Sequence, residues 1–415
     1  MLIQTVLNDC HGFAFFKYAG VIFDREKKKI TIEMSSKQSS KARCSRCETK
    51  CPTYDHQSER RFKFVPLFGY QVTIIYIPRR VQCTEHGVVI EWMPWALGKR
   101  PICRSFALFL ASWSKTLSWT DVARKFHVSW DIVFISVKYV VDYGLLNRCL
   151  DKIESIGIDE ILFRRGYHFV TLVFEITEGS KRLLWIGEGR KSKTLLRFFR
   201  ILGKAQYCSI KIVCSDMWAA YLKVVKKKLP NALHILDRFH VMKLLNKAID
   251  QTRRIEFRAL QEEGKENILT STRWLFLKSP GNLTDKQSVK LSDLVDQNLK
   301  TYKVYLMREL FQKLWTITAA RHAETFIKGW CIIANRSKID PLKRVAKTLT
   351  KHLPYLLNWF KTERKISNGT VEGFNNKVKL IMRRAFGFSS FSHLEIALYH
   401  NLGNLTEPKM THSFV

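Results

Sequence analysis

The chain has 415 residues, enough for two to four domains of ordinary size. Its 70 lysines and arginines stand against 36 acidic residues, and the net charge of +34 exceeds what solubility requires and predicts a polyanionic partner. Apolar runs stay below the roughly 18 to 20 residues of a membrane-spanning helix, and the first residues lack the basic segment of a signal peptide. We therefore expect a cytoplasmic, nucleoid-associated protein whose partner is nucleic acid and not a membrane.

Four of the ten cysteines fall between residues 44 and 83, in a pattern typical of a metal site. Cys44 and Cys47 form one close pair, and Cys83 and His86 form a second, so that two turns offer four ligands to a structural, tetrahedral Zn²⁺. Alternating apolar residues between the two pairs predict a short β-hairpin as the scaffold. Cys51 could replace one of the ligands, and buried cysteines without a metal are the alternative interpretation.

Residues 104–146 show helical periodicity, with a break predicted at residues 126–128. Ser129 is placed to cap the helix that follows, and Trp130 comes directly after it. Two helices joined by a short turn are typical of a helix-turn-helix. Core helices without a DNA role would give the same pattern, but the position after a zinc module in a very basic chain favours DNA binding.

After residue 151 the pattern changes to α/β. Three apolar, β-branched runs precede an alternation of helix, strand, helix and strand, which is the order expected of an RNase H-like sheet. Residues 245–360 then look almost wholly helical and indicate an insertion, in which Trp274 and Trp315 are expected to be core residues rather than DNA-stacking residues. A final capped helix carries Val371 and Phe374 at core spacing.

Three acidic residues stand where this core could use them together. Asp159 and Asp216 each follow an apolar run, and Glu372 lies near the start of the final helix. A carboxylate at the edge of a buried strand is costly unless a positive group pairs with it. Three such groups could hold paired Mg²⁺ or Mn²⁺ ions for displacement at phosphorus. An acid at a strand end is more often a turn or cap residue, so this pattern alone supports the trio only weakly.

Several long motifs, in order, extend this interpretation. They are RRVQCTEHGVVIEWMPWA, IGIDEILFRRGYHFVTLVFEI, LLWIGEGRKSKTL, SDMWAAYLKVVKKKLPNALHILDRFHVMKLLNKAIDQTRR, STRWLFLKSP and TVEGFNNKVKLIMRRAFGF. With them the chain resembles, over nearly its whole length, the insertion-sequence transposases of the ISL-three (ISL3) family, which join a zinc finger, a helix-turn-helix and a DDE core. The resemblance implies that Asp159, Asp216 and Glu372 are the metal-binding triad.

The same resemblance concerns two further positions. Asp237 and His240 resemble an Asp-x-x-His signature beside the second catalytic Asp, with a role in orienting the site or a phosphate, whereas a strand-end cap with a satisfied core histidine is the alternative. Glu175 stands where relatives commonly have an aspartate, which leaves the role of that position open.

Basic residues are spread along the chain and are not confined to a tail. The residues predicted to contact DNA are Arg79, Arg80, Ser129, Trp130, Arg164, Arg165, Lys377, Arg383 and Arg384.

The sequence thus predicts a multidomain α+β protein. Its expected parts are a zinc-finger module at residues 1–95, a helix-turn-helix domain at 96–150, a catalytic core at 151–244 and 361–415, and a helical insertion at 245–360. The resemblance implies metal-dependent cleavage and strand transfer of double-stranded DNA, at transposon ends and at target DNA, by a homodimer or larger assembly. A DNA-binding regulator without enzymatic activity, and an RNase H-like nuclease or resolvase, are the alternatives.

Overall fold

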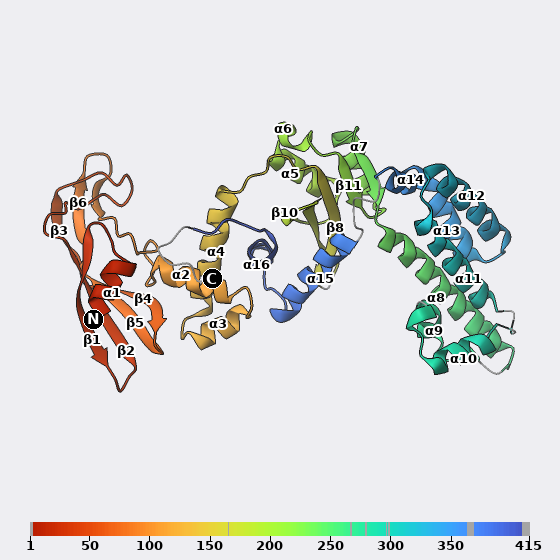
Figure 1. Cartoon of the computed structure of the whole chain (residues 1–415), viewed down its shortest axis with the longest axis horizontal. Coiled ribbons are helices and arrows are strands. Elements are labelled where there is room, and N and C mark those ends of the chain that lie inside the picture. Colours follow the sequence, from red (N-terminus) through yellow and green to blue (C-terminus); the bar gives the residue numbers. More distant parts are fainter. Residues whose placement is uncertain are drawn as a thin grey trace. The chain divides into compact units, whose positions relative to one another are not determined.

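The computed structural model describes residues 3–164, 166–265, 268–278, 280–295, 297, 299–362 and 369–408. The chain forms two compact units (Figure 1). Unit 1 comprises residues 1–148 and 380–415, and unit 2 comprises residues 149–379. The long helix α15, Gly369–Arg384, therefore contributes its first part to unit 2 and its last turn to unit 1.

Unit 1 begins with two small sheets. A four-stranded sheet has the order β1-β2-β5-β4, in which β2 and β5 are parallel and the other pairs are antiparallel. An antiparallel three-stranded sheet has the order β3-β6-β7. The elements are α1 (Ile3–Cys10), β1 (Phe16–Asp24), β2 (Lys29–Ser36), β3 (Thr53–His56), β4 (Arg60–Leu67), β5 (Tyr70–Tyr76), β6 (Arg79–Cys83) and β7 (Gly87–Ile90).

The predicted hairpin is present as β4 and β5, but it is only half of a larger sheet. Strands β1 and β2, which were not predicted from the sequence, complete that sheet. The core of the sheet is aromatic: Trp95 is 2% exposed, and the rings of Phe16 and Tyr76 lie 4.8 and 5.3 Å from it, edge to face. Such packing adds to the stabilisation that burial provides.

The second part of unit 1 is helical. Its elements are α2 (Arg104–Trp113), α3 (Trp119–Lys125), α4 (Trp130–Leu146) and α16 (Phe391–Leu402). The predicted break between two helices is confirmed, because α3 ends at Lys125 and α4 begins at Trp130. The Ser129 side chain accepts a hydrogen bond from the amide of Ile132 and caps α4, as predicted.

Unit 2 contains a five-stranded sheet of order β10-β9-β8-β11-β12. Strands β10, β9 and β8 are antiparallel, and β8, β11 and β12 are parallel. The predicted succession of three strands, helix, strand, helix and strand is confirmed. The elements are β8 (Ser155–Arg164), β9 (His168–Thr177), β10 (Ser180–Glu188), α5 (Ser192–Leu202), α6 (Lys204–Tyr207), β11 (Ile212–Ser215), α7 (Ala219–Lys228) and β12 (Leu233–Leu236).

The two faces of this sheet are covered differently. Ile156 and Ile158 of β8 belong to a core cluster with residues of α5 and α7, so these helices cover one face. Side chains alternate along a strand, so Gly157 and Asp159 point to the other face. There α15 packs: its Phe374 ring stacks on Phe174 with centroids 4.4 Å apart, and a Cβ atom on Gly157 would come within 2.7 Å of Val371. Both residues predicted at core spacing on α15 are buried.

Residues 245–360, which were expected to be almost wholly helical, lie within a body of helices (Figure 1). It comprises α8 (Arg238–Glu262), α9 (Arg273–Leu277), η1 (Pro280–Asn282), α10 (Asp285–Asp293), α11 (Lys300–Gln312), η2 (Lys313–Thr316), α12 (Ala320–Arg336), α13 (Asp340–Lys351) and α14 (Leu353–Lys361).

The two tryptophans expected in the insertion core behave differently. Trp315 is buried, as predicted, whereas the prediction for Trp274 is wrong, because its side chain is 63% exposed. The short helix α9 buries Leu275 and Phe276 instead, and Trp274 lies outside this buried pair with the Arg273 guanidinium over its ring.

Candidate catalytic and metal-binding sites

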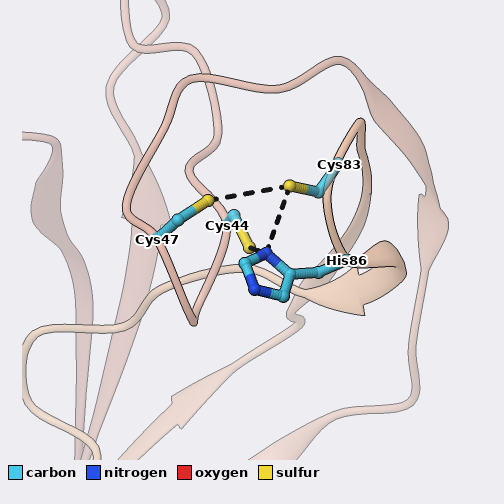
Figure 2. Close-up of side chains that lie close together, drawn as sticks. All are labelled: Cys44, Cys47, Cys83 and His86. Carbon is cyan, nitrogen blue, oxygen red and sulfur yellow. Dashed lines mark hydrogen bonds between the residues drawn. The ribbon is translucent and has the colours of Figure 1, made fainter.

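The structure gathers the four predicted zinc ligands in one cluster (Figure 2). Cys44 and Cys47 lie in the turn before β3, and Cys83 and His86 lie at the turn between β6 and β7. All four ligand atoms lie within 4.8 Å of one another. Cys47 Sγ is 3.6 Å from Cys83 Sγ, and His86 Nδ1 is 3.6 Å from Cys83 Sγ and 3.7 Å from Cys44 Sγ.

These separations suit a tetrahedral metal ion. Ligand atoms about 2.3 Å from a central Zn²⁺ stand roughly 3.7 Å apart at tetrahedral angles. The sulfur atoms are too far apart for a disulfide, which needs about 2.05 Å. Hydrogen bonding with Thr49 lowers the pKa of the Cys47 thiol to about 6, and a thiolate is the form that binds metal. The donor set therefore fits a structural zinc ion. Cys51 is buried near the cluster but is not one of its four members. It therefore does not replace any of the four predicted ligands.

In unit 2, three aspartates stand at one level of the sheet. The register of the parallel strands pairs Ile158 with Ser215 and Ser215 with Leu236. The residues that follow these three are Asp159, Asp216 and Asp237. Strands β11 and β12 end at this level, while β8 continues because its pairing with β9 continues. The acids thus line up where the parallel part of the sheet ends. We call this set the aspartate row.

Each member of the aspartate row is held by backbone amides. Asp159 Oδ1 accepts from Glu160 N at 2.7 Å, and Asp216 Oδ1 accepts from Trp218 N at 2.9 Å. Asp237 caps α8 by accepting from the amide of Phe239 at 2.9 Å. These bonds fix the orientation of the carboxylates without neutralising them.

Burial makes the ionised forms of Asp159 and Asp216 unfavourable. It raises the pKa of Asp159, which is 4% exposed, and it raises the pKa of Asp216 to about 6, with further contributions from the charges of Glu160 and Asp159. The hydrogen bonds that these two carboxylates accept oppose the shift. Two neighbouring acids whose pKa values are raised by burial are typical of a functional site. A bound cation would stabilise their ionised forms.

His240 supplies part of that positive charge. Its Nδ1 lies 3.1 Å from Asp237 Oδ2, one helical turn away. Burial alone would lower the pKa of His240, but the hydrogen bond with Asp237 and the charges of Asp159 and Asp216 outweigh it and raise the pKa. The cap and the histidine interaction occur together, so the two interpretations of this motif do not exclude one another.

Helix α15 brings Asn375 to the row. Glu372 lies in its first turn, and Asn375 lies one turn later, three residues on, which places both on neighbouring parts of the same helix face. The Asn375 amide group donates to Asp159 Oδ2. Asn375 Oδ1 is buried and has no hydrogen-bond partner among the described residues, and the same holds for Oε2 of Glu160. Asn375 Oδ1, next to the buried carboxylate of Asp159, is the kind of oxygen ligand that hard divalent cations take.

The three predicted catalytic acids do not form a closed cage like the cysteine cluster. In the described part of the chain, their oxygen atoms do not gather within 4.8 Å of one another, as the four zinc ligands do. Asp159 and Asp216 are brought together by strand register, and Glu372 is placed by the packing of α15 on the sheet.

Glu160 and Arg190 form an ion pair near the aspartate row that was not predicted from the sequence. Glu160 binds Arg190 at 3.0 Å, and the Arg190 guanidinium lies 3.9 Å from the centre of the Phe169 ring and 4.7 Å from that of Trp218. No motif or spacing in the sequence predicted a role for Arg190. Glu175, whose role the sequence left open, is buried and paired with Arg182 at 2.8 Å, on the strand next to β8.

The residues predicted to contact DNA occupy varied surroundings. The Arg79 guanidinium donates twice to the buried Glu91, and Arg80 pairs with Asp55, so both have partners within the protein. Trp130 packs between Trp119 and His393.

The other predicted DNA contacts lie later in the chain. Arg164, Lys377 and Arg383 are exposed. Arg384 is half-buried and donates to the Lys115 carbonyl. Arg165 lies outside the described residues.

One basic surface was not predicted. Helix α13 buries Leu342, Val345, Ala346 and Leu349 on one side. Its other side lines a groove with Lys343, Arg344, Lys347 and Lys351. We call these four residues the α13 basic face.

Among the described helices, none is long and apolar enough to cross a membrane.

Comparison with known proteins gives consistent matches. Residues 156–398 match a family described as transposase, of the ISL3 group, and residues 40–86 match the zinc-finger of transposase IS204/IS1001/IS1096/IS1165. The transposase for insertion sequence element IS1001 of Bordetella parapertussis is 29% identical over 349 residues, 83% of this chain and 85% of that protein. The transposase for insertion sequence element IS1557 of Mycobacterium tuberculosis is 26% identical over 374 residues, 84% of this chain and 83% of that protein.

Proposed function

The chain belongs to the ISL3 family of transposases, a family of DNA-processing enzymes, and we propose that it binds the terminal inverted repeats of its element, cleaves the DNA there and joins the ends to target DNA. The observation that carries this proposal is the aspartate row, two of whose members have raised pKa values, together with α15, the helix that carries Glu372, which packs on the same sheet and donates from Asn375 to Asp159. Asp159, Asp216 and Glu372 are the proposed catalytic residues.

The strand order of unit 2 supports the assignment. Numbered within its own sheet, it is 3-2-1-4-5, with the first three strands antiparallel and the last two parallel to the first. We interpret this as an RNase H-like core, interrupted by a helical insertion at residues 245–360 and resumed in α15. The expected domain boundaries at residues 95 and 150 belong to the same proposal.

The donor set fits Mg²⁺ or Mn²⁺. Two such ions, when bound, polarise the phosphate and activate the attacking oxygen, water for cleavage and a 3′ hydroxyl for joining. Because paired ions stand about 3.5–4 Å apart, the acids that hold them can lie farther from one another than the ligands of a single ion. Asp159 would help to hold the ions, together with Asp216 on the neighbouring strand, and Asn375 on α15 donates to it.

Residues around the acids hold them in place. The Asn375 amide orients Asp159, and the Trp218 amide orients Asp216. Asp237 and His240 lie beside these groups, and the proposed role of His240 is to moderate their charge through its own raised pKa. Partners that orient ligands in this way typically contribute about 10- to 100-fold to activity or metal affinity.

Unit 1 is proposed to recognise the DNA. The zinc cluster stabilises a module too small to rely on a large core, and α3 and α4 form a two-helix element with a short turn, which we interpret as a helix-turn-helix. A dimer or larger assembly would bring two DNA ends together.

The test separates binding from chemistry. Asp159→Asn, Asp216→Asn and Glu372→Gln are expected to keep binding to the element's end DNA in a gel-shift assay and to lose Mg²⁺-dependent strand cleavage. Glu188→Gln, an exposed acid at the end of β10, is the matched control and is expected to retain both.

Three results would contradict the proposal. Cleavage retained in all three variants would refute the site assignment. End binding without cleavage by the wild type in Mg²⁺ or Mn²⁺ would favour a DNA-binding regulator, and cleavage of branched DNA irrespective of end sequence would favour a nuclease or resolvase.

A further inference from the structure

Unit 1 contains a cavity that the proposed catalytic site does not use. It has a volume of about 610 Å³ and lies between α3 and the segment that joins α15 to α16. Every lining residue belongs to unit 1. Cavities of about 300–1,000 Å³ are the usual size of small-ligand sites.

Aromatic rings line this cavity. Trp119 is the centre of the group: its ring lies 5.5 Å from Trp130 and 6.0 Å from Phe388, between centroids. The His393 ring lies 5.0 Å from Trp130. All four residues line the cavity. Stacked and edge-on aromatic rings provide flat apolar surfaces, which is the chemistry that accepts a nucleobase.

Phe386 stands at the cavity with its side chain in solvent. It is 97% exposed, which makes it more exposed than any other large hydrophobic residue in the described part of the chain. Its φ of +53° is in the left-handed region, and it follows the last turn of α15, where a helix commonly ends on glycine or asparagine. A phenylalanine here gains nothing from burial and costs backbone energy. A function in binding explains its presence better than folding does.

Polar groups beside the rings suit a nucleotide. Arg124 and Arg384 line the cavity and bring positive charge, and Asp121 and Ser389 add hydrogen-bonding atoms. Arg124 pairs with Asp121 at 3.1 Å but is 77% exposed, so it can also meet a phosphate. The positive groups, the flat rings and the exposed phenyl side chain together favour DNA over an uncharged ligand.

We propose that this cavity receives an extrahelical nucleobase of the bound DNA, while Phe386 stacks in the gap that the base leaves. The inference rests on the proposed function in so far as that function supplies the DNA. Proteins that take a base out of the stack pay for unpairing it, and a base that is already unpaired costs least. Apolar side chains that insert between base steps act in the same way as Phe386 is proposed to act.

The experiment compares two duplexes of the same arbitrary sequence, one fully paired and one with a single unpaired extra nucleotide. Affinities are measured by fluorescence anisotropy at one fixed salt concentration. The wild-type chain is expected to bind the bulged duplex at least about fivefold more tightly, since base stacking is worth about 5- to 150-fold. Phe386→Ala is expected to lose most of this preference, and Phe386→Trp to keep it.

Phe68 offers a matched control. It is 94% exposed, has a φ of +49° and lies in the turn between β4 and β5, but it does not line this cavity. Phe68→Ala is expected to bind both duplexes as the wild type does. Circular dichroism checks that the variants are folded, as expected for exposed positions.

A second measurement locates the base. With 2-aminopurine at the extra position, wild-type binding is expected to change its fluorescence, and Phe386→Ala to reduce that change. Equal wild-type affinity for both duplexes, or a preference that Phe386→Ala leaves unchanged, would overturn the inference. Cleavage is assayed separately on end DNA with Mg²⁺, so a chain that prefers the bulge but does not cleave would count against the proposed function alone.

Discussion

The raised pKa of Asp216 leads to a prediction about stability that does not depend on DNA. Asp216→Asn replaces the carboxylate by a neutral group of the same shape, whose oxygen can still accept from the Trp218 amide. The folded-state pKa of about 6 lies above the ordinary value of 3.8. The ionised side chain therefore destabilises the folded protein, and this cost grows as the pH rises from about 3.8 to about 6 and is constant above it.

The magnitude follows from the size of the shift. About two pKa units at about 1.4 kcal/mol each give an upper limit of about 3 kcal/mol at pH 7.5. At pH 5 only about half of this cost has accumulated. Unit 2 has about 230 residues, so 1 kcal/mol corresponds to about 2–4 °C in its unfolding temperature. Asp216→Asn is thus expected to unfold up to about 6–12 °C above the wild type at pH 7.5, and by less at pH 5.

The assay is thermal unfolding in buffer freed of divalent cations by a resin. A dissolved chelator is avoided because it would also remove zinc from the cluster of Cys44, Cys47, Cys83 and His86. Millimolar Mg²⁺ is expected to raise the unfolding temperature of the wild type and not that of Asp216→Asn, since a bound ion stabilises by mass action. Glu188→Gln should follow the wild type throughout. A variant no more stable than the wild type at pH 7.5, or equally stabilised at both pH values, would refute the reasoning.

Three further predictions concern other parts of the molecule. Cys83→Ser is expected to lose bound zinc and Cys51→Ser to keep one ion per chain by metal analysis, and zinc retained in Cys83→Ser would contradict the ligand set. Lys347→Gln with Lys351→Gln is expected to flatten the dependence of log affinity on log salt by about 2 in DNA titrations, and an unchanged slope would remove the α13 basic face from the DNA path. Arg79→Met leaves a buried glutamate unpaired and is expected to cost about 3–5 kcal/mol in urea unfolding, whereas an unchanged stability with weaker DNA binding would return Arg79 to the DNA contacts.

Local patterns in the sequence predicted most of the elements of unit 2, because each carries its own signal. The three apolar runs that became β8, β9 and β10, and the Val371 and Phe374 spacing on α15, reflect burial on one or both faces. The zinc ligands could be predicted for the same reason: close pairs of cysteine and histidine have few other uses. Family membership was predicted from long sequence motifs. Such motifs identify a family more specifically than the periodicity of apolar residues does.

What the sequence did not reveal depends on contacts between distant residues. Asn375 carries no signal of its own, and its position beside Asp159 becomes visible only when α15 is packed on the sheet. The same holds for Arg190 and Glu160, which are joined by strand register and a loop. Trp274 shows the opposite error, since a large aromatic residue in a helical segment was assigned to the core although its two neighbours fill that place.

The proposed catalytic acids differ in how firmly the fold determines their positions. Asp159 and Asp216 follow directly from the pairing of β8 with β11, so any chain that forms this sheet places them at one level. Glu372 follows the helices α8 to α14 in the chain. Its position depends on two contacts of α15 with the sheet, the stacking of Phe374 on Phe174 and the close approach of Val371 to Gly157. Weakening these contacts is therefore expected to detach the third acid while leaving the aspartate row intact. The helices between β12 and α15 contribute none of the three proposed acids, but they connect the aspartate row to the helix that carries Glu372.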